Sequence, residues 1–330
     1  MRRLACLLAL LFSASALAAA PCQGTDLRPT LTESERSEID AAVAGHPYMT
    51  GNHWIARRGD TTLHLVGTIH VDDPRLDGVA QRLGPVLESA DLLLLEMTLE
   101  DQETLQTELM NDPELLLLAD TTLPEIMSED SWQALSSALA QRGMPGFMAA
   151  KMRPWYLAMM LSLPSCALDG AQAGKSGLDQ RLAEAAEAAD VPTAALEDFR
   201  TIFRTFNAAP IPEQIEMLEA ALYAADEQGD GLATLRAAYF DEQMGESWAL
   251  SKVIARRHSQ QSREEIDRSF DEMEEGLLIA RNQDWMPVIL EAAEEYDLVV
   301  IASGAAHLPG PHGLLTLLEA EGFTLERAPF

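Results

Sequence analysis

Basic residues are scarce in this chain of 330 residues. Its 23 lysines and arginines are outnumbered by 53 aspartates and glutamates, and the formal net charge is −30. An acidic surface of this strength repels nucleic acid and anionic lipid, so neither is expected as a partner. The charge favours solubility but does not define a substrate.

Long apolar runs are also absent beyond the first part of the chain. The early apolar run, residues 4–12, is far shorter than the roughly 20 residues that a membrane-spanning helix needs. It follows Arg2 and Arg3 and leads into small residues with two Ala-x-Ala patterns, which is typical of a secretory signal peptide. We therefore predict a signal peptide over residues 1–20. The mature chain, residues 21–330, is expected to be periplasmic or secreted, without stable membrane insertion.

Cysteine is rare as well, with three residues in the whole chain. Cys22 and Cys166 remain once the expected signal peptide is removed, and two thiols in an oxidising compartment predict one disulfide. Such a bond would join the mature N-terminus to the middle of the chain; a pair of free thiols is the alternative. Neither cysteine is expected to be catalytic, because each lies in a proline-containing, loop-like stretch without a nearby histidine.

Several short stretches carry the apolar patterns of β-strands, and longer helical patterns separate most of them. The first two flank Gly59-Asp60 as a hairpin, whereas the four leucines at 92–95 have the continuous apolar pattern of a buried central strand. Strands separated by helices indicate parallel pairing. We predict an α/β fold with a mixed, mainly parallel central sheet and helices on both faces. It forms one domain, with helical insertions at about 99–175 and 198–296. The strand stretches are 53–58, 62–67, 92–96, 192–197, 298–302 and 323–327.

Polar residues follow four of the expected strands. They are His70, Glu96, Glu197 and His307. Ligands of open α/β sheets bind outside the carboxyl ends of the strands, so these side chains are expected at one edge of the sheet. Two imidazoles with one or two carboxylates form the ligand set of a catalytic divalent metal site that keeps positions open for water. The same four residues could instead serve as acid and base without a metal.

Each of these histidines ends a Gly-x-x-His segment, Gly67–His70 and Gly304–His307. Glycine at the first position lets the backbone turn sharply and approach a ligand closely. One such segment is common by chance, but two copies after buried strands, with acidic strand ends between them, favour a shared site. His312 is a nearby candidate for a contact with the substrate or with the residues around the site, and Arg281 interrupts an apolar helical stretch as a candidate anion-binding residue.

This set of motifs resembles the TraB/GumN family, which includes the Tiki proteases. The matching segments are the two Gly-x-x-His motifs, Leu95-Glu96 at a strand end, Leu196-Glu197, Arg281-Asn282 followed by Trp285, and His307-Leu308-Pro309-Gly310. The resemblance covers about Trp54 to the C-terminus. It implies a Tiki-like fold, similar to erythromycin esterase and to the ChaN haem-binding proteins.

The resemblance also implies residue roles and a cofactor. The residues that carry over as catalytic are Glu96, His70, His307, Arg281 and Asn282, and those that carry over as metal ligands are His70, Glu96, His307 and Glu197. The implied reaction is metal-dependent peptide cleavage with manganese or cobalt as the ion. Tiki proteins are membrane-anchored, whereas this chain is expected to be a free acidic protein, so the Tiki substrate does not carry over.

The leading prediction is an exported, metal-dependent, peptidase-like hydrolase with a His/Glu/His site that acts on a peptide or a small molecule. One alternative is a periplasmic protein that uses the same residues to bind a small molecule or haem. The other is a metal-independent, esterase-like hydrolase on the same fold. Metal content, chelator sensitivity and the cleavage of peptides and esters distinguish the three.

Overall fold

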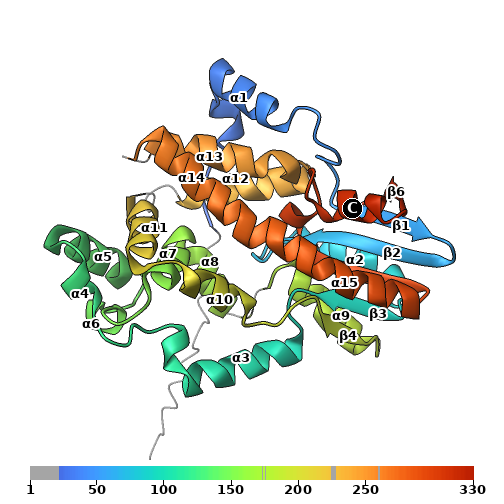
Figure 1. Ribbon diagram of the computed structural model, residues 1–330, viewed down its shortest axis with the longest axis horizontal. Helices are drawn as coiled ribbons and strands as arrows, with labels where there is room; N and C mark the ends of the chain where they lie inside the picture. Colours follow the sequence, from blue (N-terminus) through green and yellow to red (C-terminus); the bar gives the residue numbers. More distant parts are fainter. Residues whose placement is uncertain (1–21, 173, 175, 224–227, 259–260) are drawn as a thin grey trace, which may run out of the picture.

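The computed structural model describes residues 22–172, 174, 176–223, 228–258 and 261–330, so the predicted signal peptide lies outside the described part (Figure 1). Within that part, six strands form one sheet in the order β4-β3-β5-β2-β1-β6. The strands β4, β3, β5 and β2 are parallel, and β1 is antiparallel to β2 and β6, which confirms a mixed, mainly parallel sheet. The strands are β1 His53–Arg58, β2 Thr61–Thr68, β3 Leu92–Leu95, β4 Thr193–Ala195, β5 Leu298–Gly304 and β6 Thr324–Arg327.

The central strands form for local reasons. Gly59, with φ of +62°, supplies the left-handed backbone between β1 and β2. All four residues of β3 are buried, because this strand lies inside the sheet and is covered on both faces. The strands that carry the two Gly-x-x-His segments, β2 and β5, are direct parallel neighbours with Thr68 opposite Gly304. The two motifs therefore leave the sheet side by side.

Helices cover both faces of the sheet, as predicted. Leu93 belongs to the apolar cluster that includes α2 and α9, whereas its neighbour Leu94 belongs to the cluster that includes α15 and α16. Figure 1 shows α15 lying across the strands. Because α15 carries Arg281 and Asn282 in its first turn, the packing of this helix on the sheet positions both side chains. The covering helices are α2 Leu76–Leu87, α9 Leu178–Ala188, α15 Ala280–Glu295 and α16 Leu314–Ala320.

The other helices form packed regions of their own. Leu123, Leu135, Leu157 and Leu218 belong to an apolar cluster that is separate from those of the sheet. Figure 1 shows the helices around it, α4 to α7 and α11, grouped on one side, away from the strands. In the described ranges, no helix combines the length and the apolar character needed to cross a membrane.

The bounds of these helices are α1 Glu33–Val43, α3 Leu99–Asn111, α4 Leu123–Ile126, α5 Glu129–Gln141, α6 Gly146–Ala149, α7 Pro154–Ser162, α8 Ser165–Gln172, α10 Thr201–Ala208, α11 Ile211–Tyr223, α12 Gln228–Phe240, α13 Ser247–His258 and α14 Arg263–Glu274. A π-helix, Glu275–Ile279, joins α14 to α15. The short 3-10 helices are η1 Arg28–Thr30, η2 Pro113–Leu115, η4 Met244–Glu246 and η6 Ala305–His307.

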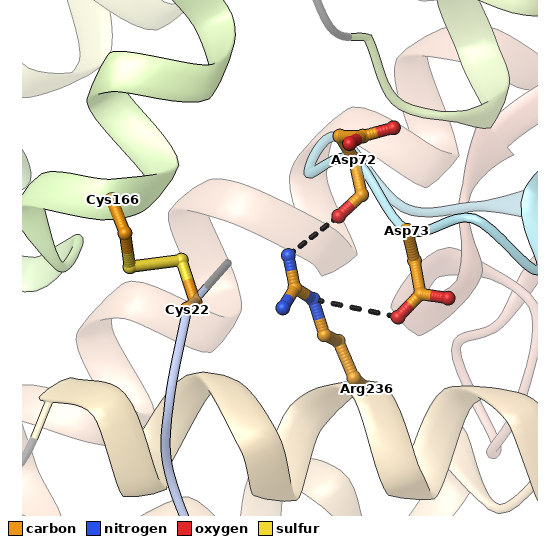
Figure 2. The surroundings of a disulfide bond; sticks show 5 residues. All are labelled: Cys22, Asp72, Asp73, Cys166 and Arg236. Atoms are coloured by element: carbon orange, nitrogen blue, oxygen red, sulfur yellow. Dashed lines mark hydrogen bonds and ion pairs between the residues drawn. A yellow bond between two sulfur atoms is a disulfide. The ribbon is translucent and has the colours of Figure 1, made fainter. Parts of the chain in front are cut away.

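The predicted disulfide between Cys22 and Cys166 is present, with the two Cα atoms 5.2 Å apart (Figure 2). It joins the N-terminal segment to α8, and the backbone of the same segment also hydrogen-bonds to side chains of α12. Figure 2 shows Arg236 of α12 contacting the backbone carbonyl of Asp72 and the carboxylate of Asp73. The disulfide therefore ties the helical region to α12, which in turn contacts the loop that follows β2.

Loss of this disulfide is expected to destabilise the protein. The bond joins residues separated by 144 positions, so its removal raises the conformational entropy of the unfolded chain. A Cys166→Ser variant should lose about 3–5 kcal/mol of unfolding free energy. Urea unfolding of the wild type and the variant measures this loss. Wild-type protein treated with a reductant should match the variant, and equal stability of the oxidised wild type and the variant would contradict the prediction.

Two histidines form a buried pair between β1 and β2. Nδ1 of His53 lies 2.8 Å from the carbonyl oxygen of Pro329 and so donates its proton there. Nε2 of His53 must then accept, and it lies 3.0 Å from Nδ1 of His64. Burial lowers the pKa of both rings, and it brings the pKa of His64 to about 4, with the nearby His53 and Arg57 acting in the same direction. Both imidazoles are therefore neutral at neutral pH.

Acidification is expected to destabilise the fold through this pair. The unfolded chain takes up a proton at a histidine near pH 6.5, whereas folded His64 does so only at about pH 4. The free energy of unfolding therefore has its full value above pH 6.5, the pKa of the unfolded histidine, and it falls as the pH decreases from 6.5 towards 4. A shift of this size corresponds to about 3 kcal/mol. A His64→Asn variant, which keeps an N–H donor and cannot titrate, should lose less stability than the wild type in urea unfolding across this window. Identical pH dependence in both proteins would contradict the prediction.

Candidate active site

The carboxyl ends of the parallel strands bring the predicted site residues to one edge of the sheet. Along the order β4, β3, β5 and β2, the strands lead into Glu197, Glu96, the Gly304–His307 turn and His70. A Cβ atom placed on Gly304 would lie 3.4 Å from Oε1 of Glu96, 3.6 Å from Cδ2 of His307 and 3.9 Å from Nε2 of His70. The two histidines and Glu96 thus converge over Gly304.

Gly67 permits this close arrangement. Its φ is not positive, so the expected sharp turn is not the reason for glycine here. A Cβ atom on Gly67 would instead lie 2.8 Å from Cβ and 2.9 Å from Cα of Ala305. Glycine at position 67 is required because the turn after β5 packs directly against the end of β2.

The guanidinium of Arg281 is the centre of the charged cluster. Its Nη2 donates to Oε2 of Glu96 and to Oε1 of Glu197, each at 2.6 Å, and its Nε lies 3.1 Å from both oxygens of Glu197. The indole N–H of Trp285 donates to Glu197 at 3.1 Å. Burial lowers the pKa of Arg281, but the two carboxylates outweigh it and raise the pKa above its ordinary value. The three charged side chains are only 10–18% exposed, so the attraction between opposite charges must offset the loss of hydration of each charge.

Asn282 sets the tautomer of His307. Its Nδ2 donates to the carbonyl oxygens of His307 at 3.2 Å and His312 at 2.9 Å, so its Oδ1 accepts from Nδ1 of His307 at 2.7 Å. Nε2 of His307 therefore carries a lone pair, and it lies 3.4 Å from Nη1 of Arg281 and 4.0 Å from Oε1 of Glu96. Burial lowers the pKa of His307 to about 4. The negative charge of Glu96 acts in the opposite direction, and the positive charges of Arg281 and His70 lower the pKa further. The imidazole is thus neutral at neutral pH.

Glu96 is ionised in this setting. Burial raises its pKa, but the surrounding imidazoles and Arg281 outweigh burial, and the N–H of Gly304 donates to Oε1 at 2.6 Å. Together they lower the pKa of Glu96 to about 2. Its two oxygens have different partners: Oε2 faces Arg281, and Oε1 faces Gly304 and His307.

His70 lies at the open side of the cluster. Because 63% of its side-chain surface is exposed, a substrate can reach the ring. The surrounding protein, by displacing solvent from the ring, would by itself lower the pKa of His70. Nδ1 of His70 lies 3.3 Å from Oδ2 of Asp179. This hydrogen bond and the charges of Asp179 and Glu96 outweigh the burial and raise the pKa of His70 to about 9. At neutral pH His70 is therefore an imidazolium whose Nε2–H is available to another acceptor.

Asp179 is the residue of this site that the sequence motifs missed. It lies in the first turn of α9, and Gly177 precedes that helix. A Cβ atom on Gly177 would lie 2.1 Å from the carbonyl oxygen of Ile69 and 2.6 Å from the backbone of His70. Glycine thus lets α9 begin against the backbone at His70, and this places Asp179 beside the ring. A glycine directly before a helix that carries an acidic residue in its first turn was the available signal.

The structure places some of the predicted residues in one hydrogen-bonded group and leaves the side chain of His312 outside it. Glu96, Arg281, Asn282 and His307 form one hydrogen-bonded group, and Glu197 joins it through Arg281. The contact made by His312 comes from its backbone carbonyl; the structure gives no contact of its imidazole with the charged cluster.

A metal ion needs several donor atoms that converge on one point. Among the described residues, no three histidine, cysteine, aspartate or glutamate side chains group closely enough to hold one. Nε2 of His307 and Oε1 of Glu96 converge as two donors, but Arg281 binds Glu197 and the second oxygen of Glu96. In this arrangement the residues do not fit the four-ligand manganese or cobalt site that the family resemblance implies.

Fold and site together define a class: an α/β protein with a buried Glu–Arg–Glu cluster and two histidines at the carboxyl ends of its parallel strands. Residues 52–327 match the sequence model of the TraB/PrgY/gumN family, and the chain belongs to that family, as its motifs predict.

Two relatives carry the name "Uncharacterized protein YbaP". The protein of Escherichia coli (strain K12) is 29% identical over 157 residues, which cover 48% of this chain and 56% of the relative. The protein of Shigella flexneri is 29% identical over 155 residues, which cover 45% of this chain and 55% of the relative. The chain thus spans a little over half the length of each of these relatives.

Proposed function

We propose that this protein is an exported hydrolase that cleaves an ester or peptide bond by acid–base catalysis with His307, Glu96 and His70. The observation that carries the proposal is the 4.0 Å separation between Nε2 of His307 and Oε1 of Glu96. Both atoms are acceptors, because Asn282 holds the proton of His307 on Nδ1 and Glu96 is ionised. Two facing acceptors at this distance can share a water molecule that donates one O–H to each, and this water would replace the long 3.4 Å contact between Nη1 of Arg281 and the same lone pair of His307.

A water molecule between these two acceptors is polarised for attack on a carbonyl carbon. His307, neutral at neutral pH, accepts the proton as the water oxygen bonds to that carbon. The negative charge of Glu96 then stabilises the imidazolium that forms, and Asn282 keeps the ring in place throughout. Arg281 holds Glu96 in its charged form.

His70 supplies the acid. Asp179 keeps it protonated, so its Nε2–H can donate to the carbonyl oxygen as negative charge develops there. The same proton can pass to the leaving group when the tetrahedral intermediate collapses. Two histidines with pKa values of about 4 and about 9 are an arrangement in which base and acid coexist at neutral pH.

Export is part of the proposal. The Cys22–Cys166 disulfide supports it, because disulfides persist in oxidising compartments such as the periplasm. The substrate is accordingly a peptide or a small molecule of the periplasm or the cell exterior.

A divalent metal, manganese or cobalt, is the second candidate for the same reaction. The convergence of a lone pair on His307 Nε2 with the Oε1 atom of Glu96 favours it, and Asn282 and Asp179 hold the Nδ1 atoms of the two histidines as groups behind metal ligands do. This candidate requires Arg281 to release Glu96.

The test is a cleavage assay of the full mature chain with p-nitrophenyl acetate and with a mixture of unstructured peptides. Each is assayed with EDTA, with Mn²⁺ and with Co²⁺. Turnover that survives EDTA and is lost in His70→Ala supports the metal-independent proposal. Turnover only with Mn²⁺ or Co²⁺ favours the second candidate. Stoichiometric haem binding without cleavage of either substrate would overturn both.

Asp179→Asn is expected to change the pH dependence of this activity. The wild type needs protonated His70, so its turnover falls as the pH rises through about 9. Loss of the Asp179 charge lowers the pKa of His70, so the alkaline limb of the variant should move down by about one or two pH units, the order of the shift that a nearby opposite charge causes. A pH–rate profile of kcat/KM measures this shift. An unchanged alkaline limb would show that His70 is not the acid.

A further inference from the structure

A cavity of about 290 Å³ lies next to Asn282, yet the charged cluster does not line it. Its walls come from α1, η4, α13, the end of α14, the π-helix and the loop at 309–313. The apolar part of the wall includes Ile39, Val43, Trp248, Leu278, Ile279 and Pro309. A volume near 300 Å³ is at the small end of the range for cavities that bind small molecules.

One segment forms both this cavity and the charged cluster. Glu274, Leu278 and Ile279 line the cavity, whereas the carbonyl oxygen of Leu277 accepts from Arg281 at 3.2 Å. This segment contains the π-helix, a form that is rare and frequent at functional sites. A ligand in the cavity would therefore contact the segment that positions Arg281 and Asn282.

The carboxylate of Glu274 has no hydrogen bond or ion pair with any described residue, and the side chain is half-buried. The other strong charges at the wall are already paired. Lys252, whose charge also acts on Glu274, lies 2.6 Å from Asp271, and Arg256 is paired with Glu38 and Asp267. The exposed His46 and His312 are the remaining titratable residues of the wall. The charge available to a ligand is thus negative.

We propose that this cavity binds a small organic cation, with its ammonium group at Glu274 and its apolar part against the aliphatic wall and Trp248. A carboxylate at the edge of an apolar cavity recognises an ammonium group by charge, and an indole ring favours a cation over its face. The strongly acidic protein also concentrates cations near its surface. The inference does not depend on the proposed hydrolase activity, because Glu274, Trp248 and the aliphatic wall take no part in the proposed catalysis.

The test is isothermal titration calorimetry of the full mature chain at about 0.15 M salt, where weak surface attraction is screened. The probes are hexylamine, hexan-1-ol and hexanoate, which share the chain length and differ in charge. Hexylamine is expected to bind with one molecule per chain, about tenfold more tightly than hexanol, and hexanoate more weakly than both. Glu274→Gln should reduce the affinity for hexylamine to that for hexanol.

The matched control is Glu275→Gln, which removes the neighbouring exposed carboxylate that does not line the cavity and should leave the affinity unchanged. Ala42→Phe fills the cavity from α1, and it should abolish hexylamine binding while circular dichroism shows an intact fold. The His70→Ala variant should bind hexylamine as the wild type does, even if no hydrolase activity is found. Equal affinities for hexylamine and hexanoate, or equal losses in Glu274→Gln and Glu275→Gln, would overturn the proposal.

Discussion

A Glu96→Gln variant is expected to lose about 10³-fold in kcat while its melting temperature changes little, within the range found for loss of one acid–base group. Glutamine keeps the volume of Glu96 and an oxygen that can accept from Gly304. It removes the negative charge that stabilises protonated His307, and with its oxygen at Gly304 its NH2 group takes the place of Oε2 beside Arg281. The charged member of the acceptor pair that carries the proposed function is therefore lost, whereas the volume of the side chain is retained.

The measurement is kcat and KM for the ester or peptide that the wild type cleaves. Because the effect is on the chemical step, kcat and kcat/KM should fall together while KM changes little. Glu291→Gln on the exposed side of α15 is the matched control and should leave kcat unchanged. A Glu96→Gln enzyme with wild-type kcat would remove Glu96 from the mechanism, even if its stability were altered.

The second large effect is expected from Arg281→Met. Methionine fills much of the space of arginine but leaves Glu96 and Glu197 close together with 18% and 11% of their side chains exposed. Removing one partner of a buried ion pair costs about 3–5 kcal/mol, because the remaining charge has no compensation. We expect a loss of this size in urea unfolding near pH 7, together with loss of activity.

Two further variants separate the charge effect from packing. Arg281→Met combined with Glu197→Gln should recover a large part of the lost stability, because one of the two uncompensated charges is gone. Arg82→Met, at an exposed position on α2, should change the stability by less than about 0.5 kcal/mol. If the single Arg281→Met variant is as stable as the wild type, the cluster does not contribute as its geometry indicates.

Much of the sheet could be predicted from local sequence because each strand has its own pattern. The four leucines of β3 indicate a strand buried on both faces, and the hairpin glycine at position 59 separates β1 from β2. The direct pairing of β2 with β5 could not be predicted in this way. Strand order depends on contacts between segments more than 200 residues apart, and no local pattern encodes them.

The site shows the same division. His70, Glu96, Glu197 and His307 follow strands, so their placement at one edge of the sheet is a consequence of parallel pairing. The sequence pattern treated Glu197 as a candidate metal ligand, whereas the structure places its carboxylate against Arg281 and Trp285. Which carboxylate is free and which is paired depends on where α15 packs.

The scarcity of basic residues, the two cysteines beyond the expected signal peptide and the two Gly-x-x-His segments are properties of the sequence alone. They determined the acidic character of the protein and its family and predicted its disulfide, because composition and short motifs do not depend on packing. Only the tertiary structure decided the protonation of the site. Burial lowers the pKa of His307, and Asn282 of α15 sets which of its nitrogens carries the proton, whereas Asp179 of α9 raises the pKa of His70. Such shifts arise from burial and from charges a few ångströms away, which are set when the helices pack on the sheet.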